Sequence, residues 1–193
     1  KKFIFEPRLI RDIFVIAIPS AVQSGIRSFA MVLMMIIIAA YGQAAIAAYG
    51  MCIRLDMLGL VIAMGLCSGV AVMVGQNLGA GRPERAQQSV RYAVTANIIF
   101  MLCVAVLYLF TAPVLLGFFG LTGESLAIGI TFMQVVPFSY FIIASGMTMG
   151  FAMNGAGATR PGMYAAITGQ VIVQAGLSAL LMLTGHPIEQ IWF

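Results

Sequence analysis

Residues 44–74 read AAIAAYGMCIRLDMLGLVIAMGLCSGVAVMV, and Arg54 and Asp56 are the only charged residues in this run. The hydrocarbon core of a bilayer is about 30 Å thick and a helix rises about 1.5 Å per residue, so roughly 20 apolar residues cross it. Polar and apolar residues do not alternate here at every second position, as they would in a strand of a membrane barrel. Because a lipid-embedded segment must satisfy its own backbone hydrogen bonds, the run predicts a transmembrane helix.

Four further apolar runs have the same character, at residues 13–40, 92–116, 126–153 and 163–183. Short segments that contain glycine separate the runs, which is typical of turns between helices. Residues 1–12 form a basic lead-in and residues 13–193 form one transmembrane lobe, in which residues 187–193 resemble the start of a further span. We therefore predict an all-α polytopic membrane protein with five complete transmembrane helices and the beginning of a sixth.

The composition excludes a soluble protein. Of the 193 residues, 62% are hydrophobic and only 8% are charged, whereas a soluble domain carries about 25% charged residues. The chain has one histidine, His186, and its three cysteines lack the spacing of metal ligands. It contains no HExxH motif and no set of serine, histidine and aspartate typical of hydrolases. We therefore predict that the protein is not an enzyme, holds no metal and needs no cofactor.

The basic residues outside the five runs predict the orientation in the membrane. The connections 41–43, 117–125 and 184–190 contain no lysine or arginine, whereas the N-terminal segment and the alternate connections contain Lys1, Lys2, Arg8, Arg11, Arg82, Arg85, Arg91 and Arg160. By the positive-inside rule, the N-terminus of this segment is cytoplasmic. The net charge of +4 is thus explained by the basic residues that set the orientation of the chain in the membrane. Nucleic acid is not an expected partner, because no basic stripe is interleaved with aromatic residues.

Three charged residues inside the runs, Arg27, Arg54 and Asp56, form a candidate intramembrane charge cluster. A charge at the centre of a bilayer costs about 2.5–3.5 kcal/mol on insertion scales, so each requires an explanation. Arg27 and Asp56 lie at similar depths on either side of the turn near residues 41–43, about 20 Å from it, which predicts an ion pair between them. Arg54 projects from another face and would reach the interface or a carboxylate outside this segment. The functional alternative is that Asp56 couples transport to an ion.

Neutral polar residues inside the runs should face the helix bundle or a cavity, because a polar group that faces lipid is costly. Hydrogen bonding between helices is the alternative role for each of them. Pro137 lies within a run and can kink its helix. The candidate cavity-lining residues are Gln23, Asn97, Gln134, Gln170 and Gln174.

The connections contain glycine-rich segments. The segment GQNLGAGRPERA at residues 75–86 is typical of a helix end, a tight turn and the start of a new helix. As a string, this segment resembles the loop after the second span of each half in the multidrug and toxic compound extrusion (MATE) family. AAYG at 47–50 with Arg54, just after Gly42, resembles the family's entry into that span, and NGAGATRP at 154–161 resembles its loop between the fourth and fifth spans. The three matches come in the family's order and at its spacing. The residues that carry the resemblance in the loops are Gly75, Gln76, Asn77, Gly79, Gly81, Asn154, Gly155, Gly157 and Arg160.

The resemblance implies a transporter of twelve helices in two six-helix lobes, in which the basic lead-in of this chain suits the second, C-terminal lobe. The partners would then be the lipid bilayer and the missing first lobe, and the location a bacterial inner membrane. The implied function is secondary active export of organic, often cationic, compounds in antiport with H⁺ or Na⁺. One recognised ion-binding carboxylate of the family lies in the first helix of the second lobe, but residues 19–30 contain no acidic residue here. We therefore expect the coupling carboxylates in the missing half.

Two alternatives to drug export stay open. A lipid-linked saccharide flippase of the related superfamily has the same two-lobe plan and tends to have a cationic cavity, with which Arg27 and Arg54 would agree. A membrane subunit without transport activity of its own is the other alternative, and the mass of the intact protein would distinguish it.

Overall fold

The computed structural model describes residues 7–184. The predicted start of a further span at residues 187–193, the loop residue His186, and the lead-in residues Lys1 and Lys2 lie outside the described residues. The helices are α1 (Pro7–Ala39), α2 (Gln43–Gly79), α3 (Pro83–Phe118), α4 (Gly123–Val135), the 3₁₀ segment η1 (Val136–Ser139), α5 (Tyr140–Gly155), α6 (Thr159–Ala166), the π-helical segment η2 (Ile167–Ala175) and α7 (Gly176–Leu183).

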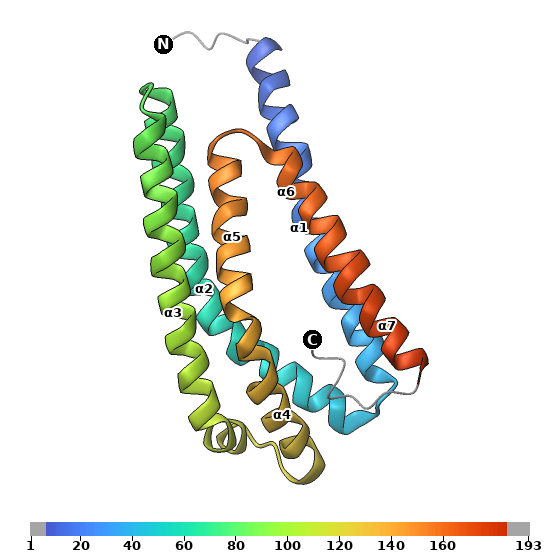
Figure 1. Cartoon of the computed structure of the whole chain (residues 1–193). Coiled ribbons are helices and arrows are strands. Elements are labelled where there is room, and N and C mark those ends of the chain that lie inside the picture. Colours follow the sequence, from blue (N-terminus) through green and yellow to red (C-terminus); the bar gives the residue numbers. More distant parts are fainter. Residues whose placement is uncertain (1–6, 185–193) are drawn as a thin grey trace, which may run out of the picture.

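The helices form two arms that meet near the turn between α1 and α2 (Figure 1). One arm consists of α2, α3 and the continuous stretch α4–η1–α5, which pack against one another. The other arm consists of α1 and the stretch α6–η2–α7, which lie side by side. The short loop after α5 connects the arms at the opposite end (Figure 1). In the bilayer each membrane-spanning segment must satisfy its own backbone hydrogen bonds. Long helices joined by short connections are therefore expected.

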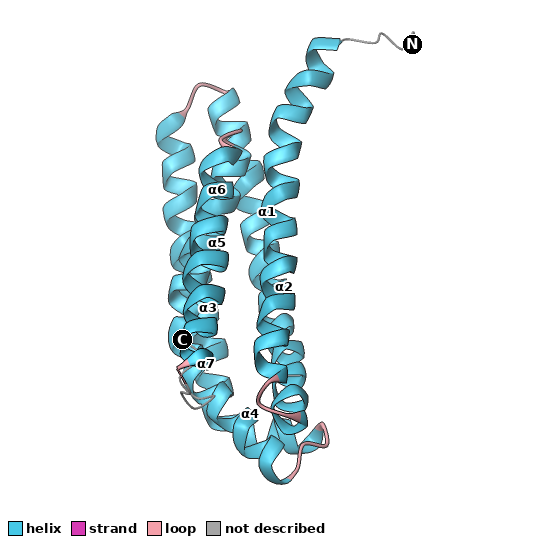
Figure 2. Cartoon of the chain, turned by 90° about the vertical axis from the view of Figure 1, so that its right-hand side faces the viewer, coloured by secondary structure: helices cyan, strands magenta, loops and turns pink. Residues whose placement is uncertain are grey.

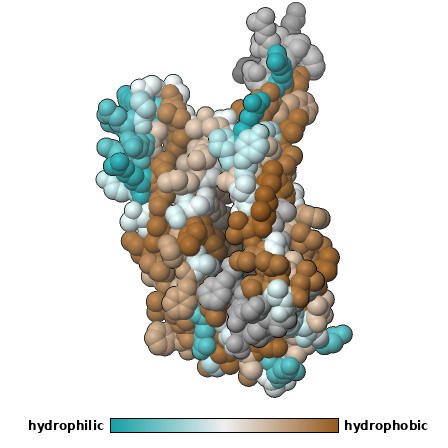
Figure 3. Space-filling model, turned by 45° about the vertical axis from the view of Figure 1, so that its right-hand side comes forward, coloured by the Kyte–Doolittle hydropathy of each residue, from teal (hydrophilic) through white to brown (hydrophobic). Residues whose placement is uncertain are grey.

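The predicted fold class is confirmed. Residues 7–184 contain helices and loops and no strand (Figure 2). Five helical stretches are long and apolar enough to cross a membrane: Ile13–Ala39, Gln43–Gly79, Pro83–Phe118, Gly123–Gly155 and Thr159–Leu181. Figure 3 shows hydrophobic side chains along the arms and hydrophilic ones gathered toward the ends. Large apolar side chains such as Val61 and Phe110 are exposed, which suits a surface that faces lipid.

Two of the five stretches are not regular α-helices. The fourth contains η1, whose second residue is Pro137. Proline lacks a backbone N–H and clashes with the carbonyl four residues earlier, which agrees with a tighter 3₁₀ turn at Pro137, whereas α1 and α3 continue as α-helices through Pro19 and Pro113. The fifth contains η2 with Gln170 and Gln174 in it. A π-helical segment is not predictable from the apolar pattern, which is the same for both kinds of helix.

Candidate functional site

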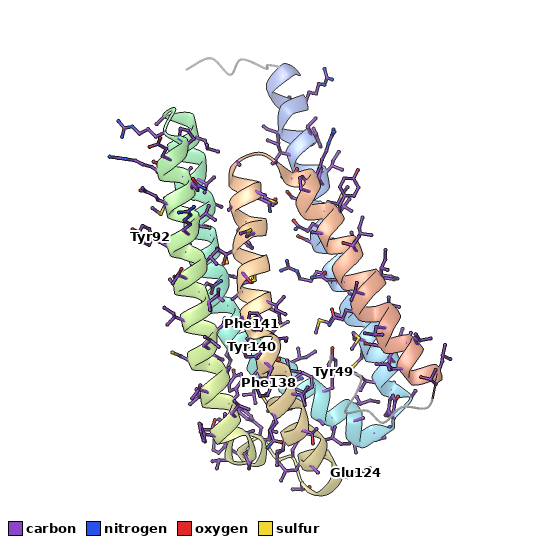
Figure 4. All side chains as sticks on the ribbon, in the orientation of Figure 1. Tyr49, Tyr92, Glu124, Phe138, Tyr140 and Phe141 are labelled. Carbon is purple, nitrogen blue, oxygen red and sulfur yellow. The ribbon has the colours of Figure 1, made fainter. Side chains whose placement is uncertain are left out.

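Asp56 is bound to α5 by a hydrogen bond that the sequence analysis missed. The hydroxyl of Tyr140 donates to Oδ1 of Asp56 over 2.5 Å. Tyr140 is buried and is the first residue of α5, directly after the 3₁₀ segment η1. Figure 4 shows Tyr140 between Phe138 and Phe141, near the place where α5 crosses α2. The break at η1 therefore determines which side chain reaches Asp56.

The helix face that carries Asp56 is the buried face of α2. Tyr49, Cys52, Gly59 and Ala63 precede and follow Asp56 at spacings of three and four residues, and all four are buried. Asp56 is itself half-buried. The carboxylate therefore projects into the bundle formed by α2, α3, α4 and α5.

Further polar contacts bind the same part of α2 to its neighbours. The hydroxyl of Tyr108 on α3 donates to the backbone carbonyl of Leu55 over 2.6 Å. The thiol of Cys52 lies 3.6 Å from the carbonyl oxygen of Gly129 on α4. These contacts and the Tyr140 bond join α3, α4 and α5 to α2 within about one turn of α2.

The predicted ion pair between Arg27 and Asp56 is wrong. Among the side chains that the structure describes, neither residue forms an ion pair, and the partner of Asp56 is Tyr140. The two helices diverge from their shared turn, because α1 packs along α6 and η2 whereas α2 packs on α3, α4 and α5 (Figure 1). Arg54 is exposed on the face of α2 opposite to the buried face. The three charges therefore do not form a cluster.

Gln23 joins α1 to α6, two helices of the same arm. Its side-chain amide donates to the carbonyl oxygen of Gly162 on α6 over 3.2 Å. A Cβ atom added at Gly162 would lie 3.1 Å from the Gln23 amide nitrogen, and one at Gly150 on α5 would lie 3.9 Å from it. The amide thus lies among α1, α5 and α6 at a point where glycines leave room for it.

Asn97 takes the alternative role, hydrogen bonding between helices. It is completely buried in α3, and its amide nitrogen lies 2.9 Å from the hydroxyl oxygen of Thr148 on α5 and 3.3 Å from the sulfur of Cys67 on α2. The sequence marked Asn97 as a polar residue in an apolar run, but neither Cys67 nor Thr148 was among the candidate residues. Only the packing of three helices shows that these residues meet.

The remaining polar candidates are divided between α4 and η2. Gln134 is exposed at the end of α4 and Gln174 is exposed in η2. Gln170, also in η2, is half-buried, and its side-chain oxygen is buried without a hydrogen-bond partner. Together with Asn97 and Gln23, they do not form a single polar site in the described part of the chain.

The glycines of the motif loops let two helices pack closely and form the turns at the helix ends. A Cβ atom added at Gly155 would clash with the backbone of Ala71, and one at Gly75 would lie 3.1 Å from the carbonyl oxygen of Gly155. These glycines therefore allow α2 and α5 to cross with their backbones in contact. Gly81 and Gly157 have φ angles of 69° and 77°, a left-handed conformation that favours glycine at the ends of α2 and α5.

The other motif residues surround these turns. The Asn77 side chain donates to the carbonyl oxygen of Met73 over 2.8 Å, whereas Gln76, Gly79 and Arg160 are exposed. The side-chain oxygen of Asn154 is buried without a hydrogen-bond partner. An open hollow of about 330 Å³ lies at this end of the lobe, lined by Val74, Leu78, Pro83, Ala86, Gln87, Val90, Met149, Ala152, Met153 and Ala156. The motifs thus shape one end of the bundle.

Comparisons with known proteins agree with this architecture. The MatE family model matches residues 19–180. The chain is 27% identical over 185 residues to the multidrug export protein MepA of Staphylococcus aureus (strain MSSA476), a match that covers 96% of the chain and 38% of MepA. It is 28% identical over 139 residues to an FAD transporter of Shewanella oneidensis, covering 72% of the chain and 31% of that protein.

Solved structures show the same fold. The outward-facing conformation of a multidrug resistance MATE family transporter superposes with a TM-score of 0.91 at 19% identity, covering all of this chain and 44% of that one. A MOP superfamily transporter from Pyrococcus furiosus superposes with a TM-score of 0.81 at 19% identity, covering 94% of this chain and 40% of that one. The chain thus spans about two-fifths of the length of the proteins that it matches.

Proposed function

Because the chain belongs to the MatE family, whose model matches residues 19–180, we propose that it forms the C-terminal lobe of a multidrug transporter. Its activity in this proposal is secondary active export of organic compounds, cations among them, in antiport with H⁺ or Na⁺. Family members of this kind are transporters and not enzymes. The family match carries the proposal, and the resemblance to the multidrug exporter MepA over 96% of the chain supports it.

The distribution of polar groups agrees with a transporter. Gln23, Asp56 and Asn97 lie within apolar helices and face neighbouring helices of the lobe. A lobe that moves as a unit during alternating access must be held together internally, and such bonds provide this. We propose that Asp56 stabilises the contact of α2 with α5, and that the coupling carboxylates lie in the missing first lobe.

The partners and the location belong to the same proposal. The first lobe would complete a twelve-helix transporter around a central cavity, and small organic cations would be among its substrates. The basic residues of the connections support a cytoplasmic N-terminus for this segment. The bacterial relatives support a place in a bacterial inner membrane. Transport in this proposal requires the coupling ion, H⁺ or Na⁺, and no cofactor.

Uptake into everted membrane vesicles tests the proposal. Vesicles that contain the full-length transporter receive a pH gradient or a Na⁺ gradient separately, and the accumulation of ethidium is followed by fluorescence. Accumulation that depends on one gradient would support antiport and identify the ion. If neither gradient drives uptake although the protein is in the membrane, drug export is refuted. The flippase alternative would then predict movement of a lipid-linked saccharide, and an auxiliary subunit would move neither compound.

A further inference from the structure

The open hollow at one end of the lobe has almost wholly apolar walls. It lies among the end of α2, the start of α3 and the end of α5, and its volume of about 330 Å³ falls within the range of about 300–1,000 Å³ for small-molecule sites. Of the ten residues that line it, Gln87 is the polar one. Val74, Ala86 and Ala152 are buried, whereas Leu78 is 41% exposed. Apolar surface therefore stays accessible at this end of the lobe.

The lengths of the helices place this hollow beside the lipid headgroups. α3 has 36 residues and is about 54 Å long, whereas the hydrocarbon core of a bilayer is about 30 Å thick. With its middle at the centre of the bilayer, α3 leaves the hydrocarbon near Val90, and Pro83 and Ala86 lie roughly 20–25 Å from the centre. The same argument puts Val74 and Leu78 of the 37-residue helix α2 outside the hydrocarbon.

An arginine stands at the edge of the wall that α3 contributes. The lining residues of α3 follow one another at the spacing of helix turns and so share one face: Pro83, Ala86, Gln87 and Val90. Arg91 comes four residues after Gln87, which makes the two neighbours on the helix surface. Long side chains of a helix lean toward its N-terminus, which takes this guanidinium toward Gln87 and the headgroups. Arg91 is exposed, and it forms no ion pair among the side chains that the structure describes.

The charge around the hollow is complementary to an anionic lipid. Residues 75–91 contain Arg82, Arg85 and Arg91 against the single acidic residue Glu84. Hydrophilic side chains gather at the end of the lobe, next to hydrophobic ones along its body (Figure 3). Basic pockets between membrane helices on the cytoplasmic side are suited to anionic headgroups, because that leaflet has a negative surface potential. A ligand that combines an apolar chain with a phosphate therefore matches both the walls and the charge.

We propose that this hollow binds an anionic phospholipid of the cytoplasmic leaflet. The glycerol esters and the upper part of one acyl chain occupy the apolar walls, and the phosphate pairs with Arg91, whose fork of donors fits two phosphate oxygens. The amide of Gln87 donates to an ester or phosphate oxygen of the same lipid. A zwitterionic lipid gains less, because it carries a cationic group beside its phosphate. The inference rests on the orientation in the proposed function, which puts the basic connections in the cytoplasm.

Native mass spectrometry of the full-length transporter in detergent micelles tests this inference. The micelles receive phosphatidylglycerol or phosphatidylcholine, and the Kd of each lipid is measured from the bound fraction. Arg91→Gln removes the proposed phosphate partner. The matched control Arg85→Gln removes an exposed arginine of the same helix from the face turned away from the hollow. Ala156→Phe adds bulk at an exposed lining position.

The expected result is a preference for phosphatidylglycerol that depends on Arg91. Its Kd should rise about fivefold in Arg91→Gln, the effect of one basic residue near anionic lipid, and stay unchanged in Arg85→Gln. Ala156→Phe should weaken the binding of both lipids. Equal affinities of the wild-type protein for the two lipids would overturn the inference, and so would equal effects of Arg85→Gln and Arg91→Gln. No gradient is applied in this assay, so a failure of ethidium export would refute the proposed function and not the lipid site.

Photolabelling of the wild-type protein covers the case in which a variant does not fold. Phosphatidylglycerol with a diazirine in one acyl chain is added to proteoliposomes of the full-length transporter, and labelled peptides are identified by mass spectrometry. Met149 and Met153 line the hollow, whereas Met73 lies outside it, and all three are exposed. Unlabelled phosphatidylglycerol should suppress labelling around Met149 and Met153 more than labelling around Met73. Equal suppression, or a hollow without label because another segment of the transporter covers it, would overturn the inference.

Discussion

Removing the carboxylate of Asp56 should destabilise the lobe by separating α2 from α5. In Asp56→Ala, the Tyr140 hydroxyl loses the acceptor to which it donates over 2.5 Å, and the tyrosine side chain is 3% exposed. An unsatisfied buried donor costs about 1–3 kcal/mol. Hydrogen bonds between membrane helices are worth about 0.6 kcal/mol on average and up to about 1.7 kcal/mol. We therefore expect a loss of about 1–3 kcal/mol in the free energy of unfolding.

A double-mutant cycle isolates the hydrogen bond from other effects of the substitution. Asp56→Ala, Tyr140→Phe and the double variant are unfolded in mixed detergent micelles, and helix content is followed by circular dichroism. The double variant should be more stable than the sum of the two single losses predicts, by about 0.6–1.7 kcal/mol. Asp56→Asn is the matched control, because its amide oxygen still accepts the Tyr140 bond.

Two results would refute this reasoning. Additive losses in the cycle would mean that the bond contributes nothing to stability. A normal folded yield of Asp56→Ala, combined with lost dependence of transport on an ion gradient, would assign Asp56 to coupling instead of to the contact between helices.

Two further predictions concern the ends of the helices. Gly155→Ala should lower the free energy of unfolding by about 1–3 kcal/mol, because its Cβ would clash with the backbone of Ala71. The control Gly146→Ala, where a Cβ meets open space, should be neutral or slightly stabilising in the same denaturation assay, and equal losses in both would contradict the close crossing. Ala158→Cys in a Cys103→Ala background should react with an impermeant maleimide only from the cytoplasmic side, since Ala158 is exposed in the loop after α5 and Cys103 is the exposed native thiol. Labelling from the outside of intact cells would invert the predicted topology.

Local properties of the sequence were enough to predict the helical fold class. The length of each apolar run and the thickness of the bilayer decide that the runs are helices, and neither depends on distant residues. Gly81 and Gly157 likewise mark tight turns from their own strings, and both have positive φ angles. Asn97 was correctly selected as an inward-facing residue from its place in an apolar run, whereas Gln134 and Gln174, selected on the same ground, are exposed in the structure.

Only the tertiary structure decided which faces meet. Equal depth along a hairpin suggested that Arg27 pairs with Asp56, but depth does not specify the direction in which a side chain projects. The direction follows from the crossing of α2 with α5, which brings Tyr140 to Asp56 across 84 positions of the chain. That crossing depends on backbone contact at Gly155 and on the 3₁₀ turn before Tyr140. A hydrophobic pattern determines where a helix runs in the membrane, whereas its partners depend on the shapes of surfaces that come from distant segments.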